Sequence, residues 1–119
     1  GGTVYDLYAY GDGGNLYDSA FNDGAAYRVI SGNSPLPVNA WSHLVSTYDG
    51  SNQRIYLNGY LISARAQSGH IKQSANPLRI GGNAVWGEYF KGTIDEVRLY
   101  NCALTPAEIS VDLAKPVGK

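Results

Sequence analysis

Apolar and polar residues alternate in short runs along most of this chain, and turn-forming residues interrupt the runs. Such alternation places successive side chains on opposite faces of a β-strand. The expected strands are residues 4–10, 16–22, 25–31, 41–48, 53–57, 60–64, 78–80 and 92–100. Short strands at regular spacing, with turn signals between them, predict an all-β fold: an antiparallel β-sandwich or barrel.

The strongest local signal is the hairpin at Asn58-Gly59, which joins the runs QRIYL and YLISA. A two-residue Asn-Gly loop favours the type I′ turn, whose twist matches that of paired antiparallel strands. Ile55 and Leu57 should then share one face of the sheet while Arg54 points to the other. This two-sided pattern favours a sandwich of two sheets.

One short helix is expected near the C-terminus, where the alternation stops. Thr105 is the predicted N-cap, Pro106 occupies the first helical position, and Glu108 completes a capping box. The helix should run to about Leu113 and end before Pro116.

Composition and charge narrow the function classes. The chain has 119 residues, 44% of them hydrophobic, and a net charge of -1. That length indicates one domain, and the lack of a basic stripe argues against nucleic acid as a partner. No apolar run approaches the length of a membrane span, so no membrane insertion is expected. The start at Gly1-Gly2, without a signal peptide or initiator Met, indicates a processed or excised piece.

Four ordered blocks carry a family resemblance: WSHLVSTYDG, RIYLNGYLI, PLRIGGN and FKGTIDEVRLYNCALTPAEI, between about residues 41 and 109. Together they resemble the laminin-G-like, concanavalin A-like lectin/glucanase superfamily, and most of all its modules in secreted bacterial proteins. The resemblance implies a jelly-roll β-sandwich over residues 1–114, followed by a tail at 115–119. It also implies glycan binding on the concave face or loop rim, and a secreted or cell-surface location.

Relatives in this family begin with further strands before the region that matches Tyr5, so the chain resembles the C-terminal part of the family fold. A sandwich without those strands would expose an apolar sheet face and unpaired edges. Three alternatives are open: a reduced fold, a partner chain that supplies the strands, or self-association. We expect association through the exposed edges.

Asp95, in the block GTIDEVRLY, is the candidate metal ligand. The resemblance implies that it helps to bind a structural calcium, a cation that takes about six to eight oxygen ligands. In the family, some of those ligands come from the earlier strands. The alternative is that Asp95 accepts a hydrogen bond from loop backbone.

Catalysis is not expected, although Asp95 and Glu96 are adjacent acids. A retaining glycosidase needs two carboxylates roughly 5 Å apart on one side of the sugar, whereas neighbouring residues of a strand point to opposite faces. The Glu-x-Asp-x-x-Glu pattern of the superfamily's endoglucanases is also absent.

Aromatic residues are the candidate ligand contacts, because the C–H face of a sugar stacks on an aromatic ring and its hydroxyls need polar partners. One set lies in the loop GGNAVWGEYFKG: Asn83, Trp86, Glu88 and Tyr89. A second set, Tyr8, Tyr10 and Tyr17, forms either a stacking platform or part of the core. Trp41 begins a family block and is assigned to packing.

These observations predict a non-catalytic carbohydrate-binding or recognition module of a larger secreted bacterial protein, with a glycan or polysaccharide as partner and calcium as a possible structural ion. The first alternative is a structural or adhesion module that binds protein or packs on a neighbouring domain. The second is a fragment of a glycoside hydrolase.

Overall fold

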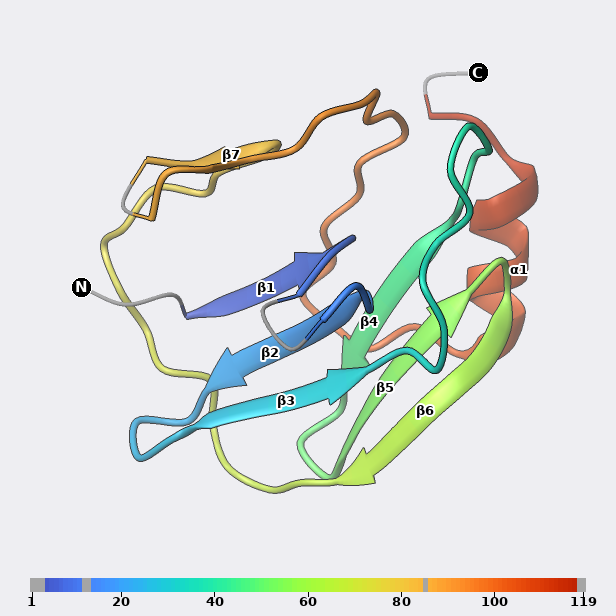
Figure 1. Ribbon diagram of the computed structural model, residues 1–119. Coiled ribbons are helices and arrows are strands. Elements are labelled where there is room, and N and C mark those ends of the chain that lie inside the picture. Colours follow the sequence, from blue (N-terminus) through green and yellow to red (C-terminus); the bar gives the residue numbers. More distant parts are fainter. Residues whose placement is uncertain (1–3, 12–13, 85, 118–119) are drawn as a thin grey trace.

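The computed structural model describes residues 4–11, 14–84 and 86–117. Its first sheet contains β1 (Tyr5–Tyr8), β2 (Asp18–Asn22) and β3 (Tyr27–Ser31), paired antiparallel in that order. The second sheet contains β4 (Leu44–Tyr48), β5 (Asn52–Leu57) and β6 (Tyr60–Ala66), again antiparallel and in sequence order (Figure 1). The predicted antiparallel sandwich is therefore confirmed.

The Asn58-Gly59 hairpin forms as predicted between β5 and β6. Both turn residues have positive φ, 51° and 83°, as a type I′ turn requires. The backbone N–H of Asn58 also donates to the carbonyl of His43 (2.8 Å), and the Asn58 side chain accepts from the backbone N–H of His43 (2.9 Å). The turn thus fixes the chain where it enters β4.

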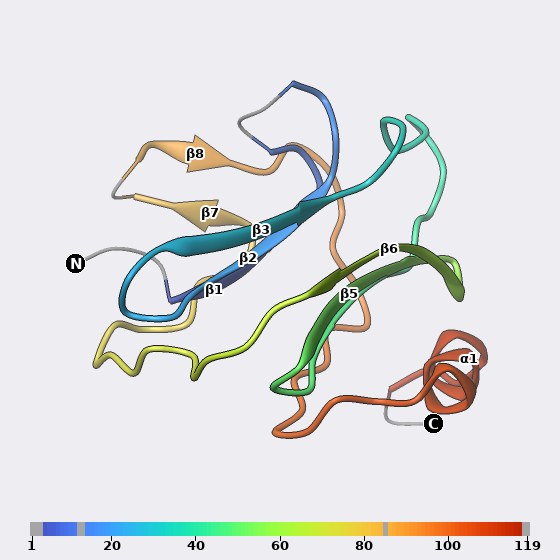
Figure 2. The ribbon, with the colours of Figure 1, turned by 90° about the horizontal axis from the view of Figure 1, so that it is seen from below.

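Helix α1 (Pro106–Ala114) begins at Thr105 with both hydrogen bonds of the capping box present, as predicted. Figure 2 shows the two sheets as layers, with α1 outside the second sheet. A Cβ at Gly59 would lie 3.3 Å from a methyl carbon of Leu113, so the helix lies close against the β5–β6 turn. Ile109 is the helix residue that is fully buried. No helix within the described ranges has the length and apolar character needed to cross a bilayer.

The core lies between the two sheets and is small. Tyr17, Ile30 and Ile55 form its buried centre, and partly buried Leu36, Leu44, Leu57 and Ile62 surround them. Ile55 and Leu57 contribute from the same face of β5, as the alternation predicted. Polar contacts also cross the interface: the Ser19 and Ser46 hydroxyls are 2.5 Å apart, and the Gln53 amide donates to the carbonyls of Ser19 (3.2 Å) and Arg28 (3.0 Å).

Two predicted strands, 78–80 and 92–100, are wrong. Both runs are irregular in the structure, and residues 91–101 form no backbone–backbone hydrogen bond with any described residue. Glu96 has a φ of 57°, which interrupts an extended backbone. A strand needs a neighbour for its N–H and C=O groups, and no described strand lies in register beside either run. Alternation alone could not reveal this.

Candidate functional site

The predicted ligand loop is a small hairpin. β7 (Gly82–Asn83) pairs antiparallel with β8 (Glu88–Tyr89), so that Asn83 lies opposite Glu88 and Gly82 opposite Tyr89. The backbone N–H of Phe90 donates to the carbonyl of Gly81 (2.9 Å) and closes the hairpin base. The pairing brings the polar candidates, Asn83 and Glu88, side by side.

The two aromatic rings of this hairpin are largely exposed: Trp86 at 66% and Tyr89 at 72%. A Cβ at Gly82 would lie only 2.7 Å from a ring carbon of Tyr89, which means that the Tyr89 ring lies close over the Gly82 backbone. The absence of a side chain at Gly82 therefore leaves the space that the Tyr89 ring occupies. The hairpin presents two solvent-facing rings beside an amide and a carboxylate.

The second aromatic set does not come together in one place. Tyr17 is fully buried in the core, so the packing alternative describes its position. Tyr10 is exposed, and its hydroxyl donates to the Asn15 side chain. Tyr8 is half-buried in β1. These residues belong to the first sheet and to the connection between β1 and β2, and none of them is part of the β7–β8 hairpin.

The packing role that the sequence predicted for Trp41 is wrong. This residue was expected to pack, but 69% of it is exposed, because it lies just before β4 and outside the sandwich. Sequence reasoning could not separate the two positions, since a tryptophan at the start of a strand can face either way. Trp41 is a further exposed ring and a useful reference for Trp86.

Asp95 forms the backbone contact that was the alternative to calcium. Its Oδ1 accepts from the backbone N–H of Glu96 (2.8 Å). No group of three or more His, Cys, Asp or Glu side chains suited to a metal occurs within the described ranges. One carboxylate falls short of the six or so oxygens that calcium takes, so the described residues do not fit the ion by themselves. A calcium role for Asp95 stays a prediction, and melting with and without a chelator tests it.

Strand alternation does not separate Asp95 from Glu96 as predicted, because their segment is irregular. Glu96 is occupied in another way: its carboxylate lies 3.7 Å from the Arg98 guanidinium and accepts from the backbone N–H of Val117. The two acids therefore have separate backbone or ionic partners.

A comparison of the sequence with models of protein families shows which family the chain belongs to. The model of the concanavalin A-like lectin/glucanases superfamily matches residues 1–110. The chain belongs to this superfamily. The resemblance drawn from the four sequence blocks is thus confirmed.

Similar proteins from animals and bacteria are also found. Pappalysin-1 of Mus musculus is 32% identical, and that of Homo sapiens 30% identical, each over 78 residues. Either alignment covers 61% of this chain and 5% of the pappalysin. A solved S-layer domain-containing protein from Clostridium thermocellum aligns with a TM-score of 0.52 at 18% identity, over 87% of this chain and 59% of that one. At this identity the solved structure shows the shared fold alone.

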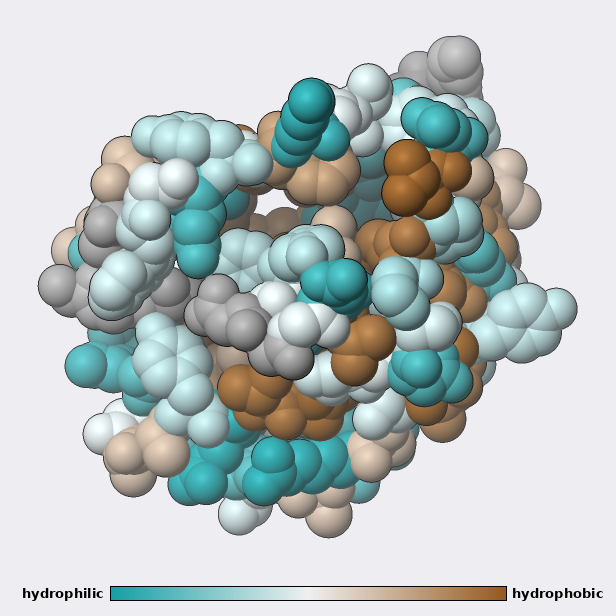
Figure 3. All heavy atoms as spheres, in the orientation of Figure 1, coloured by the Kyte–Doolittle hydropathy of each residue, from teal (hydrophilic) through white to brown (hydrophobic). Residues whose placement is uncertain are grey.

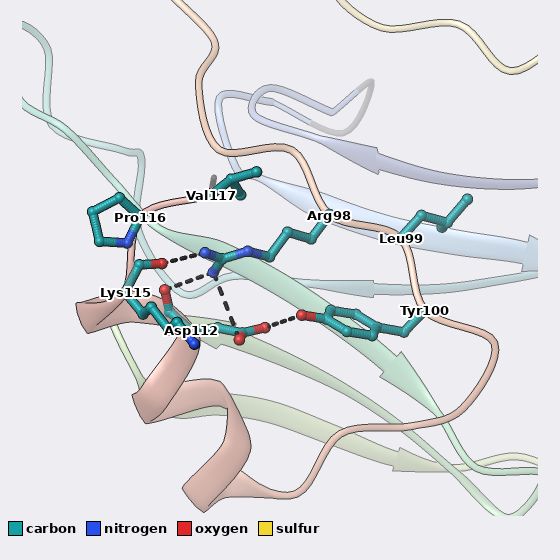
Figure 4. A pocket seen from close by; sticks show the side chains of 7 residues that line it. All are labelled: Arg98, Leu99, Tyr100, Asp112, Lys115, Pro116 and Val117. Carbon is teal, nitrogen blue, oxygen red and sulfur yellow. Dashed lines mark hydrogen bonds and ion pairs between the residues drawn. The ribbon is translucent and has the colours of Figure 1, made fainter. Parts of the chain in front are cut away.

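This concanavalin A-like domain has one further feature that sequence reasoning missed, an open groove of about 570 Å³ between residues 98–100 and the end of α1. Figure 4 shows Arg98 reaching the helix end. Its guanidinium donates to the carbonyls of Asp112 (2.7 Å) and Lys115, and the Tyr100 hydroxyl donates to the Asp112 carboxylate (2.6 Å). That hydrogen bond raises the pKa of Tyr100. A cation at a helix C-terminus satisfies its free carbonyls, so these contacts anchor the helix.

His43 lies near this groove and serves the fold. Burial, aided by the nearby Arg98 charge, lowers the pKa of His43, which favours the neutral ring. Its backbone is held by Asn58, as described above.

Proposed function

We propose that this domain is a non-catalytic carbohydrate-recognition module that acts in a secreted or cell-surface protein. The observation that carries the proposal is the β7–β8 hairpin, which holds Trp86 and Tyr89 exposed next to Asn83 and Glu88. Large exposed aromatic rings are expensive to hydrate and are typical of sites that bind a partner. Membership of a lectin/glucanase superfamily is in keeping with a sugar as that partner.

The proposed binding site is shallow, and its side chains are in place before the sugar binds. A sugar ring stacks on Trp86 or Tyr89, and its hydroxyls exchange hydrogen bonds with the Asn83 amide and the Glu88 carboxylate. Because the proposed site consists of a few exposed side chains on one hairpin, few contacts form and the affinity per site is low. The extracellular location is supported by the resemblance of the four sequence blocks to modules of secreted bacterial proteins.

A glycan array with the purified domain tests this proposal. The Trp86→Ala variant should lose about tenfold in affinity for any glycan found, because one stacked aromatic contributes roughly 1 kcal/mol or more. Trp41→Ala is the matched control, since it removes another exposed tryptophan and should leave binding unchanged. Unaltered binding by Trp86→Ala would remove the hairpin from the site.

The second candidate is a structural or adhesion module that binds protein. It is favoured by the many large apolar side chains that face solvent, among them Leu78, Ile80 and Leu99. An array without signal at high protein concentration would support this alternative. A hydrolase fragment has the least support, because the sequence lacks the superfamily's acidic triplet.

A further inference from the structure

The solvent-accessible surface of this chain is too large for its mass. It measures 8145 Å² for 12.8 kDa, whereas a folded monomer of that mass exposes about 6,300 Å². The excess is about 1,900 Å². A homodimer interface of the obligate kind buries about 1,000–2,500 Å² on each subunit, so the excess has the size of such an interface.

One long stretch of unburied residues is continuous in sequence. Within the described ranges, no residue from Ser68 to Cys102 is buried. Figure 3 shows an opening where this segment, residues 68–102, stands away from the body of the molecule. The segment carries ten exposed large hydrophobic residues: Ile71, Leu78, Ile80, Trp86, Tyr89, Phe90, Ile94, Val97, Leu99 and Tyr100.

Residues 97–99 show which way the segment faces. Arg98 points to α1 and bonds its end, whereas Leu99 points away from the helix (Figure 4). Val97 and Leu99 are 52% and 66% exposed. A surface segment of a monomer normally has the opposite arrangement, with charges outward and aliphatic side chains inward. The backbone of residues 91–101 also makes no backbone–backbone hydrogen bond with other described residues. Apart from the N–H of Glu96, which donates to the Asp95 side chain, the stretches on either side of Glu96 can therefore pair with a neighbouring chain.

We propose that a second copy of this chain covers this face, in a twofold dimer centred on residues 91–101. A twofold contact needs one self-complementary patch, and this segment supplies both outward aliphatic side chains and free backbone donors and acceptors. The net charge of -1 per chain sets no electrostatic barrier to pairing. The excess surface of the whole chain has the size that a dimer of this type buries, and it exceeds the roughly 800 Å² per partner of a standard transient complex.

Sedimentation equilibrium of the 119-residue chain tests the dimer, with Leu99→Asp and Val97→Asp as the disrupting variants. Each substitution enters a twofold interface twice, so the dimer dissociation constant should rise about a hundredfold. Both side chains are exposed in the single chain, so the folded monomer should keep its circular dichroism spectrum. Val38→Asp is the matched control, because Val38 is exposed in the loop between β3 and β4.

Each result of these experiments either supports or overturns the proposed dimer. A dimer that Leu99→Asp or Val97→Asp dissociates, and that Val38→Asp leaves intact, supports the proposal. A monomer at the highest soluble concentration overturns it, as does a dimer that only Val38→Asp weakens or an open-ended series of larger species. If the variants at positions 97 and 99 both fail to fold, disulfide cross-linking of the natural chain tests the proposal instead. Cys102 is exposed at the end of this segment. Disulfide-linked dimers under mild oxidation would support the proposed interface, and their absence would overturn it.

Discussion

The side-chain amide of Gln53 donates a 3.0 Å hydrogen bond to the backbone carbonyl of Arg28, across the interface between the two sheets. Gln53 is almost completely buried and makes a second such bond to Ser19. In a sandwich whose apolar centre contains few residues, these bonds help to set how the sheets align. Removing this buried amide removes two hydrogen bonds that join the sheets.

Replacing Gln53 by Ala should therefore lower the free energy of unfolding by about 2 kcal/mol, since it removes two buried hydrogen bonds and opens a cavity. Urea denaturation measures the change. Gln73→Ala, at an exposed position, is the control and should have almost no effect. Equal stability of the two variants would mean that the cross-sheet bonds contribute nothing net.

Tyr17→Phe should leave the domain as stable as before or make it more stable by up to about 1 kcal/mol. The reason is that the Tyr17 hydroxyl is buried and has no hydrogen-bond partner among the described residues. Its ring, by contrast, fills the core against Gly32, where a Cβ would lie 2.1 Å from the ring. Thermal unfolding of Tyr17→Phe checks the prediction, and a marked loss of stability would reveal a partner for the hydroxyl.

Thr105→Ala should weaken helix α1 by about 1 kcal/mol, because the Thr105 side chain accepts from the backbone N–H of Glu108 and anchors the capping box. Amide hydrogen exchange within α1 should become faster while β5 is unaffected. Thr93→Ala, in the exposed irregular segment, provides the matched control. Uniformly faster exchange over the whole domain would contradict a local role.

Acid should destabilise the domain between about pH 4 and pH 2. In the turns that follow β2 and β4, backbone N–H groups hold the pKa of Asp23 and Asp49 at about 2, with help from Arg28 and Arg54. A carboxyl with a lowered pKa in the folded state stabilises it above the unfolded value of about 4, and this contribution disappears as the pH falls toward 2. Chemical denaturation at several pH values should show the slope.

The Asp23→Asn, Asp49→Asn double variant keeps the turn acceptors but cannot titrate at these sites. Its stability should therefore change less between pH 4 and pH 2 than that of the natural sequence. An identical slope in both proteins would assign the acid sensitivity to other carboxyl groups.

Sequence reasoning succeeded where the deciding interactions are local. The Asn58-Gly59 turn and the Thr105 capping box each depend on a few adjacent residues, and both form as predicted. It failed for residues 92–100, because a strand exists only if another strand lies beside it, and that neighbour is a non-local property. The same limit explains Trp41 and Tyr17, whose exposure depends on where distant elements end.

The candidate site was predictable only in its composition. The sequence gathers Asn83, Trp86, Glu88 and Tyr89 within a few positions, but it cannot reveal that β7 and β8 pair and turn the rings outward. Arg98 was missed altogether, since its partners on α1 follow more than ten residues later. A basic residue upstream of a well-capped helix was the available signal.

The position of α1 also has a kinetic consequence. The helix packs against the β5–β6 turn, yet about 40 residues separate it from the end of β6, and closing a loop of that length costs about 3 kcal/mol of chain entropy. The contacts between the helix and the β5–β6 turn offset this entropy loss, and they can form only after the second sheet has formed. We therefore expect the sheet to fold first and the helix to arrive late, so that in rapid-mixing experiments substitutions in β5 slow folding whereas substitutions in α1 mainly accelerate unfolding.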